Sequence, residues 1–346
     1  AALASLWWAE KPSPARAVLF GIALAAAVLS KFSSLVFLPA AWSLMYLWHV
    51  VRDRPGFPGA LKEVWRRAFS ALLVSVIAVV SIWAGYRLTF GPVEFLGVSL
   101  PAPALFNGLR VVWEHNQTGH MAYLLGQRSM TGFWYYYPVV LGVKTPLAML
   151  LLLLWTGWTA IRNRDRRSVV MPLAFALGIL LFSAMSRINI GVRHILPVYF
   201  GFCVACGIAI GAARPRTPAR IALYSLLGWH VVSGAILHPN YLAYTNELAG
   251  ARPEDVVADS DLDWGQDMKR LGEYLKRAGA TKVTMTLLNR GYPYAGHDFP
   301  RILPMNPARP APGWNAVSIT EWKVARFDAG DKPVWPDVLT PKVRIG

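Results

Sequence analysis

The sequence predicts an α-helical polytopic membrane protein that ends in a small α/β domain. The 346 residues are 55% hydrophobic and only 16% charged, and a soluble domain of this length would carry more charge. Apolar runs that approach the thickness of a bilayer recur along the first 236 residues. The chain also has 15 tryptophans and 13 tyrosines, residue types that are enriched at the two interfaces of a membrane.

Seven apolar runs are predicted to cross the membrane as helices. The first two are short, so a tight helical hairpin with Lys31 at its tip is the alternative for this pair. Residues 1–8 resemble the end of a further apolar segment, and we therefore expect membrane segments upstream of Ala1. The seven runs cover residues 17–30, 35–51, 68–86, 135–160, 169–185, 195–210 and 221–237.

Basic residues between the runs predict the orientation of the spans. Threading seven spans places four connections on one side, and together they carry 14 Lys and Arg residues. The positive-inside rule makes that side cytoplasmic. The four connections are residues 10–16, 52–67, 162–167 and 214–220. The extracytoplasmic side then holds Lys31, the outer loop 87–134, the turn 186–197 and residues 237–346.

The net charge of +16 also lies in the membrane part of the chain. Residues 237–346 are nearly neutral, with 14 Lys and Arg against 13 Asp and Glu. A basic membrane part with a balanced tail is typical of cytoplasmic loops, and it argues against nucleic-acid binding.

The pattern changes after residue 236, which divides a multi-spanning domain of residues 1–236 from an extracytoplasmic α/β domain of residues 237–346. Residues 263–278 have apolar residues on one helical face and are expected to form a helix. Segments rich in β-branched residues predict strands at 281–288 and 316–320.

Seven cations on the extracytoplasmic side are the first candidates for chemistry, because topology requires none there. A cation fixed at the mouth of an apolar segment can bind a phosphate at the depth of the lipid headgroups. The alternative is that single cations snorkel to headgroups or pair with acids of the distal domain. The seven are Lys31, Arg87, Arg110, Arg128, Lys144, Arg187 and Arg193, of which Lys31, Lys144 and Arg193 lie at such mouths.

The densest polar patch of the outer loop contains Glu114, His115 and His120. Glu114 and His115 could orient a hydroxyl acceptor or assist proton transfer, or they could belong to a polar surface helix. The two histidines are five residues apart, a poor helical spacing for two ligands of one metal, so a zinc site is not favoured. No cofactor is assigned from the sequence, and a divalent metal is left open.

The aromatic segment 132–138 runs into the fourth apolar run. It could form an aromatic belt at the membrane interface. Alternatively, its rings and hydroxyl groups could line a sugar or lipid pocket beside Lys144. The pocket residues in that interpretation are Trp134, Tyr136 and Tyr137.

The Asp-rich turn 259–267 invites comparison with a calcium site. An EF-hand loop that starts at Asp259 would need Gly at its sixth position and Glu at its twelfth, where the chain has Trp264 and Arg270. We therefore expect no such loop, but a turn in which Asp263 caps the following helix.

Seven motifs stand in the order found in bacterial membrane glycosyltransferases. Through them the chain resembles, over essentially its whole length, the enzymes that are similar to dolichyl-phosphate-mannose protein mannosyltransferases and to the lipid A aminoarabinose transferase. The motifs are Leu29-Ser-Lys31-Phe, Trp113-Glu-His, Gly132-Phe-Trp-Tyr-Tyr-Tyr-Pro138, Lys144-Thr-Pro, Asn189-Ile-Gly-Val-Arg-His-Ile-Leu-Pro197, His238-Pro-Asn-Tyr-Leu-Ala-Tyr-Thr-Asn246 and residues 259–267.

The resemblance implies a GT-C fold in the bacterial cytoplasmic membrane. It implies an inverting transfer of a sugar from a polyprenyl-phosphate donor to a lipid, glycan or protein acceptor. The acidic catalytic base is then expected upstream of Ala1. Lys31 and Arg193 match basic positions of the family that would offset charge on the departing phosphate. The candidates for donor binding as a whole are Lys31, Arg128, Lys144, Arg193 and His194.

Two other functions are left open. A lipid-phosphate or glycolipid transporter, such as a flippase, would need polar residues along a path through the centre of the bilayer. The predicted spans offer few of them, namely Ser70, Ser75, Ser81, Ser183 and His230. A structural assembly subunit would instead use the outer domain to bind a partner.

Overall fold

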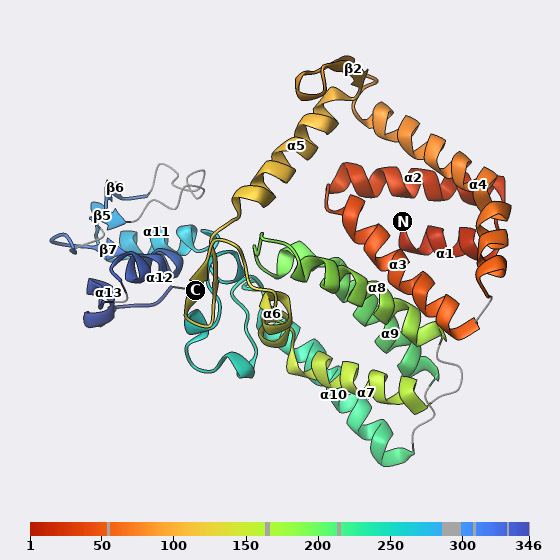
Figure 1. Ribbon diagram of the computed structural model, residues 1–346. Coiled ribbons are helices and arrows are strands. Elements are labelled where there is room, and N and C mark those ends of the chain that lie inside the picture. The colour runs from red at the N-terminus through yellow and green to blue at the C-terminus, as the bar shows by residue number, and fades with distance from the viewer. Residues whose placement is uncertain are drawn as a thin grey trace. The chain divides into compact units, whose positions relative to one another are not determined.

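A computed structural model describes most of the chain, and it is mostly helical, as the sequence predicts (Figure 1). The residues described are 1–53, 56–162, 167–212, 216–285, 299–306, 309–330 and 332–345. Contacts group the chain into two compact units, which are described in turn. The first comprises Ala1–Thr118, Thr159–Ser186 and Pro197–Ala212, and the second comprises Gly119–Trp158, Arg187–Leu196 and Ala213–Gly346.

Helices form most of the first unit. Helix α2 packs on α4, α3 packs on α8, and α8 packs on α9. The antiparallel hairpin β1–β2 follows α4 and leads into α5. The elements are α1 (Ala2–Glu10), α2 (Pro14–Ser30), α3 (Ser34–Asp53), α4 (Gly56–Gly85), β1 (Phe90–Val93), β2 (Val98–Pro101), α5 (Pro103–Thr118), α8 (Arg167–Ala184) and α9 (Pro197–Ala212).

Small residues allow the helices of the first unit to approach closely. A Cβ atom built on Gly178 of α8 would lie 2.7 Å from the carbonyl oxygen of Ala40 in α3. One built on Gly21 of α2 would lie 2.8 Å from the carbonyl oxygen of Val74 in α4. Glycine at such contacts is typical of helix pairs in membranes, where close backbone packing replaces the hydrophobic effect.

Four helices are long and apolar enough to cross a membrane, in the windows Ser34–Arg52, Arg67–Gly85, Arg167–Ala184 and Thr217–Ile236. The pair α6 and α7 makes a fifth if its two members count as one bent span. Helices α2 and α9 are apolar but shorter. The membrane character of the chain is thus supported, while the number of seven spans stays a prediction. The basic connections at residues 54–55, 163–166 and 213–215 lie outside the described residues.

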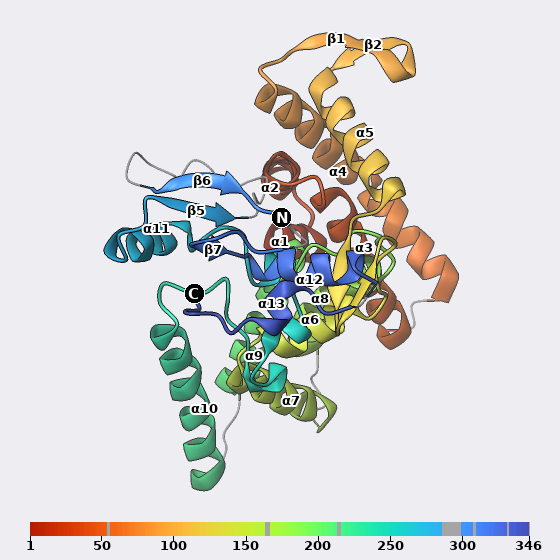
Figure 2. The same ribbon diagram turned by 90° about the vertical axis from the view of Figure 1, so that its left-hand side faces the viewer.

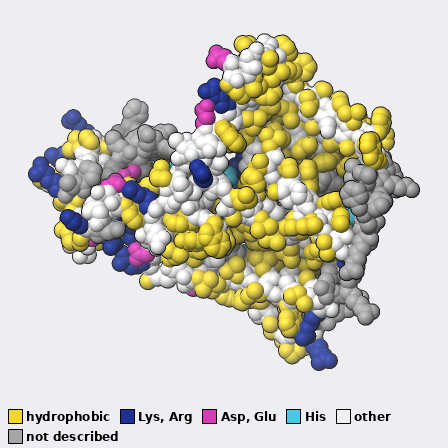
Figure 3. All heavy atoms as spheres, in the orientation of Figure 1, with side chains coloured by type: hydrophobic (Ala, Val, Ile, Leu, Met, Phe, Trp, Pro, Cys, Tyr) yellow, Lys and Arg dark blue, Asp and Glu magenta, His cyan; other side chains and the backbone are white. Residues whose placement is uncertain are grey.

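Apolar side chains remain exposed along these helices (Figure 3). Leu72 in α4, Leu154 in α7 and Val231 in α10 are each at least 60% exposed. Rows of exposed large apolar side chains on long helices fit contact with lipid better than contact with water.

The second unit begins with the antiparallel hairpin β3–β4 and contains the predicted fourth span. That span is not continuous: α6 ends at Lys144, α7 starts at Leu147, and the two axes differ by 115°. Pro146 lies in the break, and proline disfavours a helical conformation in the residue before it. The elements of this part are β3 (Ala122–Leu124), β4 (Gln127–Ser129), α6 (Tyr136–Lys144), α7 (Leu147–Arg162, whose last turn belongs to the first unit) and α10 (Thr217–Ile236).

A small α/β substructure follows α10 in the same unit. Strand β5 pairs in parallel with β6 on one side and β7 on the other (Figure 2). Leu275 of α11 packs with Val283 and Met285 of β5 in its core. The elements are α11 (Met268–Arg277), β5 (Lys282–Met285), β6 (Arg301–Pro304), β7 (Asn315–Ala316), α12 (Ile319–Asp328) and α13 (Trp335–Val338).

Two sequence predictions in this region need correction. Of the strand expected at 316–320, only Ala316 lies in a strand, the two-residue β7. Ser318 instead precedes the first turn of α12, and Glu321 stands three residues later, a helix-start pattern. Asp263 does not cap α11, which begins at Met268. The Asp263 carboxylate instead accepts hydrogen bonds from the Gly265 amide (3.0 Å) and the Ser318 hydroxyl. Residues 286–288 of the other predicted strand lie outside the described residues.

Candidate functional site

The predicted site residues fall into both units. Lys31, Glu114 and His115 belong to the first unit. Lys31 follows the last residue of α2, and its amide donates to the Ala27 carbonyl (3.1 Å). Glu114 forms an exposed ion pair with Arg110 (2.6 Å) one turn earlier in α5. The carboxylate of Glu114 therefore has a partner, as the surface-helix interpretation expects.

In the second unit, most of the predicted residues gather around Asp261, which the sequence interpretation did not select. Asp261 lies in a short 3-10 helix, η5 (Asp259–Asp261), and is 1% exposed. One carboxylate oxygen accepts from the Val192 amide (2.9 Å), and the other accepts from the Tyr136 hydroxyl (3.0 Å). Burial raises the pKa of this carboxyl above its ordinary value, and the Asp259 charge adds to the effect.

Lys144 is buried against the backbone of the same cluster. Its ammonium donates to the carbonyl oxygens of Leu242 (2.7 Å) and Asp261. The predicted phosphate-binding role of Lys144 is not favoured by this arrangement, because two of its three N–H groups bind carbonyls.

Asn246 satisfies the backbone at the break between α6 and α7. Its side-chain amide donates to the carbonyls of Gly142 and Thr145, both at 2.6 Å, and its own amide donates to the Val143 carbonyl (2.7 Å). The last carbonyls of a helix have no partner within it. Asn246 and Lys144 therefore hold the end of α6 to the segment that follows α10.

The turn before α9, residues 186–197, packs closely against Asp261 and is hydrogen-bonded to Ser260. Gly191 has a φ of 86°, and a Cβ there would lie 2.9 Å from a carboxylate oxygen of Asp261. The Ser260 hydroxyl donates to the Ile190 carbonyl (2.9 Å). Asn189 accepts from the Phe133 amide (2.7 Å). Only glycine combines this backbone conformation with this close approach to Asp261.

This turn presents Arg193 and His194 in the 3-10 helix η2 (Val192–Ile195), directly before α9. The Arg193 Nε donates to the Ile190 carbonyl (3.1 Å), and the guanidinium carbon lies 3.9 Å from the centre of the Trp264 ring. The His194 ring stacks on Tyr137 at 6.2 Å with an interplanar angle of 22°. Arg193 is thus oriented by a carbonyl and by an aromatic face.

The aromatic residues proposed as pocket walls differ in their surroundings. Tyr136 and Tyr137 are buried, and the Tyr137 hydroxyl donates to the Ile188 carbonyl (3.2 Å). They connect α6 to the turn rather than line an open surface. Trp134 is 74% exposed.

Arg128 has the partner that the alternative interpretation expects. It pairs with Asp328 of α12 (2.8 Å) and lies over the Phe327 ring at 5.6 Å. An acid of the C-terminal region therefore accounts for this cation.

Asp261 and Asn246 are the residues that sequence reasoning missed. Both stand within the quoted motifs, at 259–267 and 238–246, but the sequence does not show that these segments meet at α6. Among the described residues, no group of three or more His, Cys, Asp or Glu side chains could hold a metal ion. Comparison with protein families, with curated proteins and with solved structures finds no match.

Proposed function

We propose that the protein is an inverting membrane glycosyltransferase with a GT-C-like core of seven spans. It takes a sugar from a polyprenyl-phosphate donor and transfers it to an extracytoplasmic lipid, glycan or protein. It resides in the bacterial cytoplasmic membrane, with residues 237–346 on the extracytoplasmic side. The motif order and the positively charged extracytoplasmic turns support this function.

The observation that carries the proposal is the fixed guanidinium of Arg193. It stands at the start of an apolar helix, oriented by the Ile190 carbonyl and the Trp264 ring. Arginine stays charged under all physiological conditions and offers several N–H donors in one plane, which suits a phosphate.

In the proposed reaction, Arg193 stabilises the leaving group, which is the lipid phosphate. A hydroxyl oxygen of the acceptor attacks the anomeric carbon as the bond from that carbon to the phosphate oxygen breaks. The lipid phosphate departs with the electron pair, and a single displacement inverts the anomeric configuration. The hydroxyl proton goes to an acidic catalytic base, as the family resemblance implies. Arg193 offsets the negative charge that grows on the phosphate.

The test compares turnover of a radiolabelled polyprenyl-phosphate sugar by the full-length protein and its variants. Arg193→Ala is expected to lower kcat by roughly a hundredfold, the usual cost of removing one donor to a developing charge. Arg193→Lys should retain part of the activity, because it keeps the charge but not the planar donor set. Arg187→Ala, an exposed position in the same turn, is the matched control and should change little.

Two results would contradict the proposal. One is that the lipid carrier crosses the membrane with its sugar–phosphate bond intact, which is the behaviour of a transporter. The other is that transfer occurs and Arg193→Ala leaves kcat unchanged.

A further inference from the structure

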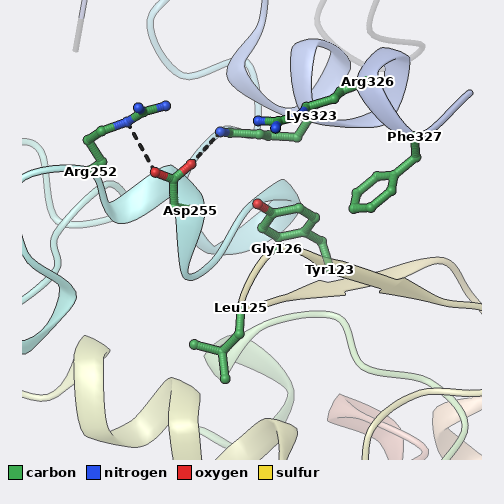
Figure 4. A pocket seen from close by; sticks show the side chains of 8 residues that line it. All are labelled: Tyr123, Leu125, Gly126, Arg252, Asp255, Lys323, Arg326 and Phe327. Atoms are coloured by element: carbon green, nitrogen blue, oxygen red, sulfur yellow. Dashed lines mark hydrogen bonds and ion pairs between the residues drawn. The ribbon is translucent and has the colours of Figure 1, made fainter. Parts of the chain in front are cut away.

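The second unit also contains a hollow that was not identified from the sequence. Its lining does not include Asp261 or the residues that donate hydrogen bonds to the Asp261 carboxylate. Three segments form it: the β3–β4 hairpin, the 3-10 helix η4 (Pro253–Asp255) with the residue before it, and α12 (Figure 4). Its volume is about 430 Å³, within the range of small-molecule sites. The lining residues are Tyr123, Leu125, Gly126, Arg252, Asp255, Lys323, Arg326 and Phe327.

The hollow carries three cations against one carboxylate. Asp255 bridges Arg252 (3.1 Å) and Lys323 (2.6 Å), as the dashed lines in Figure 4 show. Arg326 lines the hollow one turn after Lys323, and it forms no ion pair with any residue that the structure describes. Arg252 also lies 3.9 Å from the Glu254 carboxylate, so Arg326 supplies the positive charge that remains, while Lys323 is paired and only 3% exposed.

Tyr123 adds a neutral donor and an aromatic face. Its ring is buried and meets Phe327 at 5.9 Å and 64°. Burial, with the nearby Asp255 charge, raises the pKa of Tyr123 to about 12, so the hydroxyl keeps its proton at neutral pH. Within the described part of the chain this hydroxyl has no hydrogen-bond partner.

A second hollow shares Arg252 and Arg326 with the first. Its volume is about 510 Å³, and its lining includes Trp322, Pro336 and two carboxylates, those of Glu254 and Asp337. The two arginines thus line both hollows, whose volumes exceed that of an inorganic anion.

We propose that these residues bind an anionic carbohydrate, a sugar that carries a carboxylate or a phosphate. Arg326 receives the anionic group, while Lys323 stays paired with Asp255. Asp255 accepts from sugar hydroxyls, and Tyr123 donates to a ring or hydroxyl oxygen. A site for an inorganic anion needs only hydrogen-bond donors. This site also has a carboxylate acceptor and an aromatic face, which suit the hydroxyl groups and ring of a sugar. The proposal does not depend on the transfer reaction.

Binding to the purified full-length chain in detergent tests this site by calorimetry with four probes: glucuronic acid, glucose 1-phosphate, glucose and inorganic phosphate. Both anionic sugars should bind at least tenfold more tightly than glucose and than inorganic phosphate. Their affinity should fall as sodium chloride is raised, because the hollow is open to solvent.

Three variants locate the binding. Arg326→Ala should weaken both anionic sugars by about tenfold, the usual effect of losing a charged hydrogen bond. Tyr123→Phe keeps the buried ring and should weaken them severalfold. Arg277→Ala removes an exposed arginine of α11 outside the hollow and should leave affinity unchanged. Thermal unfolding confirms that each variant is folded.

Four results would overturn the inference. These are the absence of binding by either anionic sugar, equal affinity for glucose, equal affinity for inorganic phosphate, and affinities that neither Arg326→Ala nor Tyr123→Phe reduces. Glycosyl transfer is not measured in this experiment, so its failure and the failure of the proposed transferase are distinguishable.

Discussion

The Asp261 carboxylate illustrates how a buried charge is accommodated in this protein. Desolvation makes an ionised carboxylate costly, and hydrogen bonds to it recover part of that cost. Here the Val192 amide and the Tyr136 hydroxyl provide them, while the Lys144 ammonium binds the carbonyl of the same residue. Asp261 therefore joins α6, the turn before α9 and the segment after α10.

The raised pKa of Asp261 predicts a definite pH dependence of stability. A carboxyl whose pKa is higher in the folded state binds its proton more tightly there. Its stabilising contribution is complete below the ordinary value of 3.8 and is lost as the pH rises through the raised value. Asp261→Asn cannot ionise, so the melting temperature of the wild type relative to this variant should be higher at pH 4 than at pH 7.5.

Thermal unfolding of both proteins across this pH range measures the effect. Each unit by which the pKa is raised contributes about 1.4 kcal/mol to the difference. Other titrating groups are common to both proteins and cancel. A wild type that gains stability over Asp261→Asn as the pH rises would show that the fold favours the ionised carboxylate.

At the scale of elements, one proline explains the break between α6 and α7, and hydrogen bonds from another segment stabilise it. The sequence predicted a continuous span at 135–160, whereas the chain bends by 115° at residues 145–146. Pro146 explains the position of the break. Asn246 explains why it is tolerated, because it occupies the carbonyls that the interrupted helix leaves unpaired.

Close helix packing in the first unit gives a prediction at the same scale. Gly178→Val in α8 should destabilise the protein by about 2 kcal/mol, because the new side chain would meet the backbone of α3. Gly207→Val in α9 is the matched control, since a Cβ there meets nothing within 4 Å. Thermal unfolding in detergent measures both. Equal melting temperatures for the two variants would argue against the close contact of α3 and α8.

At the scale of the whole molecule, the compact units do not follow the order of the chain. The second unit collects Gly119–Trp158, Arg187–Leu196 and Ala213–Gly346. Segments that precede residue 236 thus share a unit with those that follow it. The division predicted at residue 236 describes membrane topology and stays a prediction, whereas contacts between segments that are distant in sequence define the compact units.

The predicted topology is open to a labelling experiment. In a variant without Cys203 and Cys206, single cysteines replace Glu10, Ser33 or Gln117. A thiol reagent that cannot cross the membrane should label intact spheroplasts at positions 33 and 117 and not at position 10, because α2 separates position 10 from position 33. Permeabilised cells should be labelled at all three. Labelling of position 10 in intact cells would contradict the orientation.

The sequence by itself determined the helical, membrane-like character of the chain and the positions of its apolar helices, except for the break between α6 and α7. These properties follow from local composition and periodicity, which a single segment carries. Only the tertiary structure decided that Asp261 and Asn246 meet α6, that Lys144 binds carbonyls, and that Arg128 pairs with Asp328. Those pairings join residues about 100 to 200 positions apart, and no local pattern specifies which distant partner satisfies a buried polar group.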